Sequence, residues 1–213
     1  MAAGRMPALQ GRQACCQARK PGQFLGLWGN TGIMAGYRVL RSQKLYDGRV
    51  FELIVDEIEY DSGNRAVREI AKHAGGSVVV PITLEGTLLL IRQYRYPIHE
   101  FIYELPAGKL GPGEDPVSCA RRELLEETGY VADAMTPLGS ILTSPGFCTE
   151  RLHLFLALGL RPEGSGQQLE EGELSLTVEP VPFTRALEMV RTGAIVDAKT
   201  ICGILMARDR LKS

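Results

Sequence analysis

The sequence predicts an α/β fold in which a mixed sheet is flanked by about three helices and preceded by a region of antiparallel strands. Short apolar, β-rich runs separated by glycine-bearing turns occupy residues 37–96. An amphipathic helical segment follows at 116–128, and two further helical patterns close the chain at about 182–192 and 197–211. With 213 residues and 45% hydrophobic content, the chain suits one domain with a sizeable core.

The first 36 residues differ in composition from the rest. They contain no Asp or Glu, and their four cations are Arg5, Arg12, Arg19 and Lys20. We expect either a disordered extension or a start placed upstream of the true one at Met34, with the domain itself at 37–213. A targeting segment is the remaining alternative, because the stretch bears arginines and lacks acids, although it also lacks the serines of a transit peptide.

The strand-like stretches alternate with turn signals in chain order. Strands are expected within 37–72 and at 77–84, 87–96 and 151–160. Turns are expected at Asp47-Gly48, at 61–64 and at Glu85-Gly86, and the last of these predicts a hairpin between 77–84 and 87–96 with a buried face. The polar, glycine-bearing stretch 161–173 is expected to be a mobile loop.

Charge and cysteine content argue against several classes of protein. Because four of the 24 Lys and Arg lie in the first 36 residues, the remaining chain carries 20 cations against 25 anions. An acidic body argues against wide contact with nucleic acid or an anionic membrane, which need clustered cations. The five cysteines form no C-x-x-C pair, and no apolar run approaches the roughly 18 residues of a membrane span. We therefore expect reduced thiols in a cytoplasmic protein.

The stretch GKLGPGEDPVSCARRELLEETGY (108–130) carries the densest chemistry. Asp115 suits the N-cap of a helix, Pro116 suits its first turn, and Gly129 suits its C-terminal stop. Between them, apolar residues recur at spacings of three and four, which gives the helix one face to bury.

Three glutamates of this helix, Glu123, Glu126 and Glu127 (the acidic triplet), share one face that spans roughly 100°. Such neighbours lie about 5–6 Å apart, where like charges repel by roughly 3 kcal/mol at an effective dielectric near 20 and by under about 1 kcal/mol in water. A solvated acidic face relieved by Arg121 and Arg122 is one interpretation. In a partly enclosed cleft a divalent cation becomes the natural relief, and oxygen-only ligands favour Mg²⁺ or Mn²⁺.

The order of the residues favours the metal. The stretch matches every fixed position of the Nudix box, and the matching residues are Gly108, Glu114, Arg122, Glu123, Leu124, Glu126, Glu127 and Gly129. Tyr130 stands where that family usually has an aliphatic residue, which affects packing and not ligands. From about residue 37 to its end, the chain therefore resembles a Nudix hydrolase. The resemblance implies an α/β/α sandwich, with the box as loop–helix–loop, that cleaves nucleoside diphosphates linked to another moiety.

The resemblance also implies roles for residues of the box. The acidic triplet would hold Mg²⁺, and the carbonyl of Ala107 is implied as a further ligand. A metal bound there would neutralise phosphate oxygens and acidify a water molecule. Arg122 would orient the glutamates, and Glu114 would either touch the metal or brace the loop.

Features outside the box resemble the ADP-ribose pyrophosphatase branch, and they are the stretches ELPAGK (104–109), SPGF (144–147) and REIAKHAGGSVVV (68–80). Arg95 matches the position where that branch uses an arginine on the substrate diphosphate; the alternative is a strand residue paired with an acid. Glu104 would lie near the substrate or form an ion pair with Arg95. Arg68 is a third candidate for substrate binding.

In this branch the base that activates water comes from the mobile loop before the next strand. The candidates here are Glu170, Glu171 and Glu173, and we choose Glu173, with Glu171 next. A solvated loop charge is the alternative, and Glu126 would then be the fallback base. His73 and His153 could serve as ligands or bases, but lone histidines on strands are more often structural, and a glutamate-based mechanism needs neither.

The leading hypothesis is a Mg²⁺-dependent hydrolase that splits ADP-ribose into AMP and ribose 5-phosphate. One alternative is a pyrophosphatase for other nucleoside diphosphate sugars, since nothing in the box reads the base or the sugar. Another is a catalytically silent Nudix domain that senses nucleotides. In this branch the N-terminal strands commonly build a homodimer, so the strand-rich region 37–72 predicts one. We expect a small-molecule partner, and neither nucleic acid nor a membrane.

Overall fold

The structure, a computed structural model, describes residues 36–164, 166–169 and 171–212. Most of the predicted N-terminal extension (residues 1–35) and the base candidate Glu170 lie outside the described residues. The strands are β1 (Tyr37–Asp47), β2 (Glu52–Tyr60), β3 (Arg65–Lys72), β4 (Gly76–Pro81), β5 (Thr87–Arg95), β6 (Glu100–Glu104), β7 (Ala107–Lys109), β8 (Tyr130–Leu142), β9 (Arg151–Pro162) and β10 (Thr177–Pro182). The helices are α1 (Pro116–Thr128), the single 3-10 turn η1 (Glu171–Glu173), α2 (Phe183–Thr192) and α3 (Ala198–Leu211).

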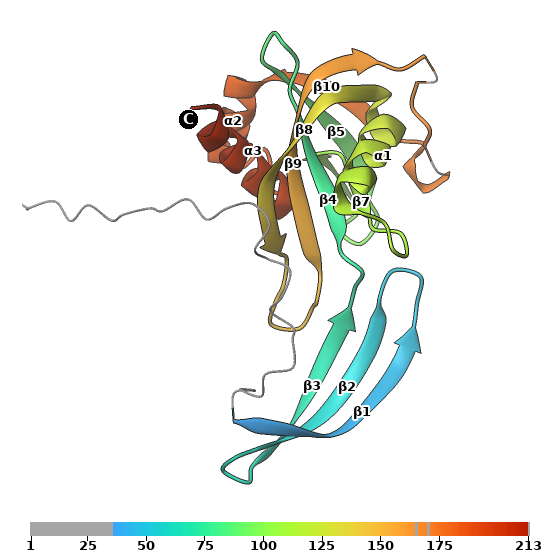
Figure 1. The fold of residues 1–213 in the computed structure, drawn as a ribbon, viewed down its shortest axis with the longest axis vertical. Helices are drawn as coiled ribbons and strands as arrows, with labels where there is room; N and C mark the ends of the chain where they lie inside the picture. Colours follow the sequence, from blue (N-terminus) through green and yellow to red (C-terminus); the bar gives the residue numbers. More distant parts are fainter. Residues whose placement is uncertain (1–35, 165, 170, 213) are drawn as a thin grey trace, which may run out of the picture.

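The strands form three sheets, with the orders β1-β2-β3, β10-β5-β6 and β7-β4-β9-β8. β4 runs parallel to β9, whereas the other pairings of these strands are antiparallel, so the arrangement is mixed, as predicted. Figure 1 shows α1 on one side of the two central sheets, with α2 and α3 on the other.

Alternating side chains of β4 connect the layers. Val79 belongs to a buried cluster with Ala120 and Leu124 of α1. Val78 and Val80 point to the opposite face, where the second buried cluster contains residues of both α2 and α3. A strand covered by helices on both faces confirms the predicted α/β/α sandwich.

The three helices begin and end within one residue of their predicted bounds. The carboxylate of Asp115 caps α1 by accepting a hydrogen bond from the Ser118 N–H at 3.2 Å. Gly129 ends α1 in the left-handed conformation with φ of 73°, which is strained for other residues. Among the helices described, none is both long and apolar enough to cross a membrane.

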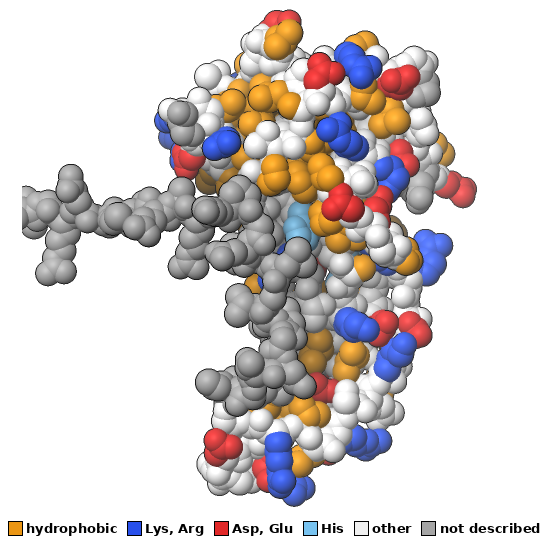
Figure 2. All heavy atoms as spheres, in the orientation of Figure 1, with side chains coloured by type: hydrophobic (Ala, Val, Ile, Leu, Met, Phe, Trp, Pro, Cys, Tyr) orange, Lys and Arg blue, Asp and Glu red, His pale blue; other side chains and the backbone are white. Residues whose placement is uncertain are grey.

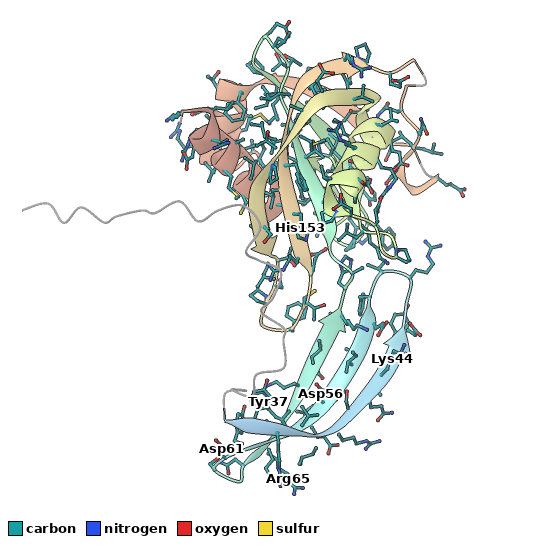
Figure 3. The ribbon with its side chains drawn as sticks, in the orientation of Figure 1. Tyr37, Lys44, Asp56, Asp61, Arg65 and His153 are labelled. Carbon is teal, nitrogen blue, oxygen red and sulfur yellow. The ribbon has the colours of Figure 1, made fainter. Side chains whose placement is uncertain are left out.

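The sheet β1-β2-β3 extends away from the sandwich (Figure 1). Ala71, at the end of β3, connects this sheet to the loop between β8 and β9. Its N–H donates to the Phe147 carbonyl at 2.8 Å, and its carbonyl accepts from the Thr149 N–H at 3.0 Å. Hydrophobic side chains reach the surface of this part of the molecule (Figure 2). Figure 3 shows Tyr37, Asp61 and Arg65 at the end of the sheet that lies far from the sandwich.

The predicted hairpin between 77–84 and 87–96 is wrong. β4 and β5 belong to different sheets. The turn at Glu85-Gly86 does form, and it is held by an isolated β-bridge between Ile82 and Leu88 and by a hydrogen bond from the Thr83 N–H to the Thr87 carbonyl at 2.9 Å. The reason is that β4 has β7 along one edge and β9 along the other, so neither edge is open to β5. Burial of every residue of β4 fits this central position.

Four strands, β6, β7, β8 and β10, were not predicted. β8 contains Pro137, and β10 contains Pro180 and Pro182, and proline lowers the expectation of a strand because it cannot donate to the ladder. Both are edge strands, where a missing N–H is tolerated.

Candidate active site

Two members of the acidic triplet, Glu123 and Glu127, lie against β7. Glu127 is 2% exposed and Glu123 is 7% exposed, whereas Glu126 is half-buried. The Ala107 N–H of β7 donates to Glu127 Oε2 at 2.8 Å. A Cβ on Gly108 would lie 1.8 Å from Glu123 Oε1, so glycine is required where β7 passes this carboxylate. A fully solvated acidic face is therefore the wrong interpretation for Glu123 and Glu127.

Arg122 compensates part of this negative charge. Its Nη1 donates to Glu123 Oε1 at 2.6 Å and to Glu126 Oε2 at 2.9 Å. Its Nε and Nη2 donate to the two carboxylate oxygens of Glu114 at 3.0 and 3.1 Å. Glu114 Oε2 also accepts from the Gly111 N–H at 2.8 Å, a contact that braces the loop before α1.

Burial and hydrogen bonding shift these carboxyl groups in opposite directions. Burial raises the pKa of Glu127 to about 8. The charges of Glu123 and Glu173 raise this pKa further, whereas the hydrogen bond from Ala107 lowers it. Burial also raises the pKa of Glu123, more than Arg122 lowers it. By contrast, the hydrogen bonds from Arg122 and Gly111 lower the pKa of Glu114 to about 2.

The loop after β9 reaches the same helix. The Gln168 N–H donates to the Glu126 carbonyl at 2.8 Å, and Nε2 of Gln167 donates to the Glu127 carbonyl at 2.6 Å. Glu173 in η1 is half-buried and close enough for its charge to raise the pKa of both Glu123 and Glu127, whereas Glu171 is exposed. Of the two described loop candidates, Glu173 thus lies close enough to act on the charges of Glu123 and Glu127, while its role as base stays a prediction.

A cleft of about 600 Å³ adjoins β7. Ala107 and Gly108 line it, as do two predicted substrate-binding residues, Arg95 and Glu104. Arg95 donates through Nε and Nη2 to both carboxylate oxygens of Glu104, at 2.5 and 2.7 Å. Burial alone would raise the pKa of Glu104, but the hydrogen bonds from Arg95 and the charge of Lys199 outweigh it and lower that pKa. The ion pair between Arg95 and Glu104 is therefore present and lines the cleft, while a role of either residue in substrate binding stays a prediction.

Arg68 lies on β3, outside the set of described residues that line the cleft. It is exposed on β3, where its Nη1 donates to the Val67 carbonyl at 2.9 Å and its Nη2 donates to the Tyr60 hydroxyl. His153 lies on β9 (Figure 3), and its pKa is lowered by burial and by Arg151.

Sequence reasoning missed the contribution of α3 to this cleft. Asp197 and Lys199 line it, and Lys199 Nζ donates to Glu104. The pair is 95 residues apart in the chain, and no local pattern connects them. The sequence signal that could have indicated this contribution is Asp197 as an N-cap, followed two positions later by Lys199, at the start of the predicted helix 197–211.

The carboxylates fit a hard divalent cation by their chemistry. Within the described residues, no three His, Cys, Asp or Glu side chains are already arranged around a common metal position. The nitrogen Nη1 of Arg122 lies between Glu123 and Glu126, so a cationic atom already stands where these two oxygens converge. Buried oxygen donors with excess negative charge suit Mg²⁺ or Mn²⁺, provided that Arg122 moves aside.

The sandwich, the buried acidic helix and the adjoining cleft with a fixed arginine together define an enzyme that acts on phosphorylated small molecules. The profile of the NUDIX domain matches residues 72–201, which is more than half of the chain. The chain belongs to the Nudix family of hydrolases, whose members generally need divalent metal ions.

Two curated relatives and one solved structure are similar over most of the chain. A methanol dehydrogenase activator of Bacillus methanolicus is 38% identical over 177 residues, 82% of this chain and 95% of the relative. An ADP-ribose pyrophosphatase of Bacillus subtilis strain 168 is 38% identical over 167 residues, 78% of this chain and 90% of the relative. The crystal structure of an ADP compounds hydrolase superposes with a TM-score of 0.72 at 23% identity and covers 83% of this chain and 95% of that chain, which supports the fold.

Proposed function

We propose that this protein hydrolyses the diphosphate of ADP-ribose to AMP and ribose 5-phosphate in a Mg²⁺-dependent reaction. The observation that carries the proposal is the position of β7. Its Ala107 donates to the buried Glu127, its Gly108 lies against the buried Glu123, and both residues also line the cleft that contains Arg95. A diphosphate in the cleft would lie within reach of both the acidic helix and a fixed cation. Similarity to an ADP-ribose pyrophosphatase supports the choice of substrate.

In this proposal each residue of the box has one task. Glu123, Glu126 and Glu127 would hold Mg²⁺, together with the carbonyl of Ala107. When bound, the metal supplies charge neutralisation of the phosphate oxygens and lowers the pKa of a water molecule. Nη1 of Arg122 would have to leave its position between Glu123 and Glu126. Arg122 would then stay bound to Glu114 and orient the other glutamates from there.

The residues around the substrate have complementary tasks. Arg95 uses the N–H groups that Glu104 leaves free to bind oxygens of the diphosphate. Glu173 accepts the proton of the attacking water. As the new bond from water oxygen to phosphorus forms, the bond from that phosphorus to the bridging oxygen breaks, so the bridging oxygen leaves on the other phosphate. The two products are the monophosphates AMP and ribose 5-phosphate.

We further propose that the active form is a cytoplasmic homodimer built through the β1-β2-β3 sheet. Val39, Leu40 and Val67 of this sheet are exposed hydrophobic side chains in the single chain. The partners are small nucleotide sugars, and neither nucleic acid nor a membrane is expected, because the body of the chain carries more anions than cations.

The proposed function is tested by a panel of ADP-ribose, UDP-glucose and GDP-mannose with Mg²⁺, with release of nucleoside monophosphate as the measured product. We expect kcat/KM for ADP-ribose to exceed the others at least tenfold. Glu127→Gln should lose about 100-fold or more in kcat, because the metal contributes several kcal/mol of charge stabilisation. Glu188→Gln, at a half-buried glutamate of α2 that pairs with Arg191, is the control and should leave the rate unchanged.

Other outcomes of the panel point to the alternatives. Comparable rates on GDP-mannose would replace the proposal with a general nucleotide-sugar pyrophosphatase. Tight binding of ADP-ribose without any turnover would favour a nucleotide sensor. A Glu127→Gln variant with the full rate would overturn the metal role of that residue.

A further inference from the structure

The first turn of α3 forms part of the wall of the cleft. Asp197, Ala198 and Lys199 line the cleft together with Arg95 and Glu104. The side chain of Lys199 is 13% exposed, so it is held against the protein and does not extend into solvent. A lysine in this position places an ammonium group beside the arginine that we assign to the substrate diphosphate.

Glu104 brings the two cations together. Its carboxylate is 1% exposed and accepts two hydrogen bonds from Arg95 as well as one from Lys199 Nζ. The bidentate pair with Arg95 alone matches the charge of Glu104 and uses both of its oxygens. Lys199 is therefore a second cation on Glu104, and the carboxylate that balances its charge is Asp197, whose Oδ2 lies 3.0 Å from Lys199 Nζ.

The position of Lys199 is fixed by a second set of contacts at the start of α3. Asp197 Oδ2 accepts from Lys199 Nζ at 3.0 Å and from the Thr200 N–H at 3.0 Å, so Asp197 also serves as the N-cap. The Leu105 N–H donates to Thr200 Oγ1 at 2.8 Å, which ties the backbone beside Glu104 to the same turn. A Cβ on Gly203 would lie 2.5 Å from a methyl group of Leu105, so glycine lets α3 approach this closely.

Counting donors leaves hydrogen-bonding capacity toward the cleft. A lysine ammonium has three N–H groups, and two of those of Lys199 are used by Glu104 and Asp197. An arginine has five, and Arg95 gives one from Nε and one from Nη2 to Glu104. Asp197 both caps α3 and pairs with Lys199, so the two cations Arg95 and Lys199 are balanced by the two carboxylates Glu104 and Asp197. The remaining donors of Arg95 and Lys199 belong to side chains that line the cleft.

We propose that Lys199 is a further substrate-binding residue, which α3 positions beside Arg95 so that the two cations bind phosphate oxygens of one diphosphate. This inference rests on the proposed function and adds a residue to the substrate site, at the opposite end of the chain from the predicted candidates. Glu104 and Asp197 act as positioning residues that hold the two cations at a fixed separation. The ligand class is a diphosphate, because two adjacent cations match two adjacent phosphate groups.

The test compares Lys199→Met, Lys199→Arg and the control Arg208→Gln, which removes an exposed cation from the last turn of the same helix. The steady-state constants for ADP-ribose are measured with Mg²⁺. The dissociation constants of ADP-ribose and of inorganic pyrophosphate are measured by calorimetry in EDTA, so that binding has a readout apart from turnover. If Lys199→Met does not fold, Lys199→Gln, which keeps an N–H donor toward Glu104, takes its place.

We expect Lys199→Met to raise KM for ADP-ribose, and the dissociation constants, at least tenfold, with kcat within threefold of wild type. Lys199→Arg should recover most of the affinity, and Arg208→Gln should behave as wild type. An unchanged KM and unchanged dissociation constants, with a lower melting temperature, would overturn the proposal and leave Lys199 as a structural partner of Glu104.

The same experiment separates this inference from the proposed function. A wild-type protein that binds pyrophosphate but does not hydrolyse ADP-ribose, and whose Lys199→Met variant binds pyrophosphate less tightly, would overturn the function and support the phosphate role of Lys199. A wild-type protein that neither hydrolyses ADP-ribose nor binds either ligand would overturn both.

Discussion

Glu127 and Arg122 illustrate how single residues distribute charge in this site. The guanidinium of Arg122 forms hydrogen bonds with Glu114, Glu123 and Glu126, so one cation serves three carboxylates. Glu127 is 2% exposed and receives a neutral backbone N–H from Ala107. A buried carboxyl group with this environment favours its protonated form, in line with its raised pKa.

This raised pKa predicts how the stability of the metal-free protein depends on pH. In the unfolded chain the pKa of Glu127 is near its ordinary value of 4.5, and in the folded protein it is about 8. The folded state binds this proton more tightly, so the free energy of unfolding should fall as pH rises from about 4.5 to about 8. Thermal unfolding in EDTA should give a lower midpoint at pH 8 than at pH 6.

Glu127→Gln is the control for this pH dependence, because the amide cannot ionise. In the variant, the free energy of unfolding should fall much less with rising pH. The fall that remains is due to Glu123, whose pKa is also raised. Adding Mg²⁺ to the wild type should raise the midpoint more at pH 8 than at pH 6, since the metal binds the ionised carboxylate. A wild-type midpoint that changes with pH in the same way as that of the variant would contradict the prediction.

Gly108→Ala tests the close approach of β7 to the acidic triplet. The added methyl group would lie 1.8–2.3 Å from the carboxylate atoms of Glu123, so either β7 or this side chain must shift. We expect a loss of about 100-fold or more in kcat and a destabilisation of about 1–3 kcal/mol, as for other overpacked sites. The measurements are steady-state kinetics with Mg²⁺ and thermal unfolding.

The matched control is Gly164→Ala, in the loop after β9. Nothing lies within 4 Å of a Cβ at that position. Its activity should equal that of the wild type. Equal activity of Gly108→Ala would instead mean that the position of Glu123 is not critical.

Among the elements, α1 and the loop after β9 act together. A helix leaves its last carbonyl groups without partners inside the helix. Here the Gln168 N–H binds the Glu126 carbonyl, the Gln167 side chain binds the Glu127 carbonyl, and the Glu163 N–H binds the Gly129 carbonyl at 2.8 Å. The loop that carries the proposed base is thus anchored on the last turn of the helix that carries the proposed metal ligands.

This anchoring leads to a prediction about η1. Glu173→Gln should lower kcat for ADP-ribose by about 10²–10⁴-fold, the range for loss of a general base, with little change in KM. Glu171→Gln, two residues away on the same turn and exposed, should stay within a few-fold of wild type. Stabilisation by Mg²⁺ should be the same in both variants, because neither residue is assigned to the metal.

The opposite order of effects would transfer the role of base to Glu171. Full activity of both variants would remove the loop from the chemistry and favour Glu126, the fallback base.

The elements also show which parts of the structure a sequence can specify. α1 was predicted to within its caps because Asp115, Pro116 and Gly129 act on their immediate neighbours. The pairing of β4 was not, because its partners β7 and β9 are chosen by burial across the whole fold. Likewise the acidic triplet was recognisable from local spacing, whereas Lys199 meets Glu104 only after α3 docks beside β6.

At the scale of the whole molecule, the sheet β1-β2-β3 is the least integrated part. It meets the sandwich at the end of β3 and through Lys109 Nζ, which donates to the Arg49 carbonyl at 2.7 Å. Every residue of β1 after Tyr37 is exposed in the single chain. A three-stranded sheet with this much exposed surface gains stability when a second surface covers its apolar side chains.

The proposed homodimer follows from this exposed sheet, and its mass is the direct test. Light scattering on the full chain should give about twice 23.3 kDa, because a stable interface needs about 800 Å² from each subunit and this sheet offers apolar residues for it. Val67→Asp, which puts a charge on the exposed sheet, should shift the population toward monomer and lower activity. Leu84→Asp, at an exposed turn of the sandwich, is the control and should leave the mass unchanged. A wild-type protein that is monomeric at every concentration and still fully active would show that one chain completes its own site.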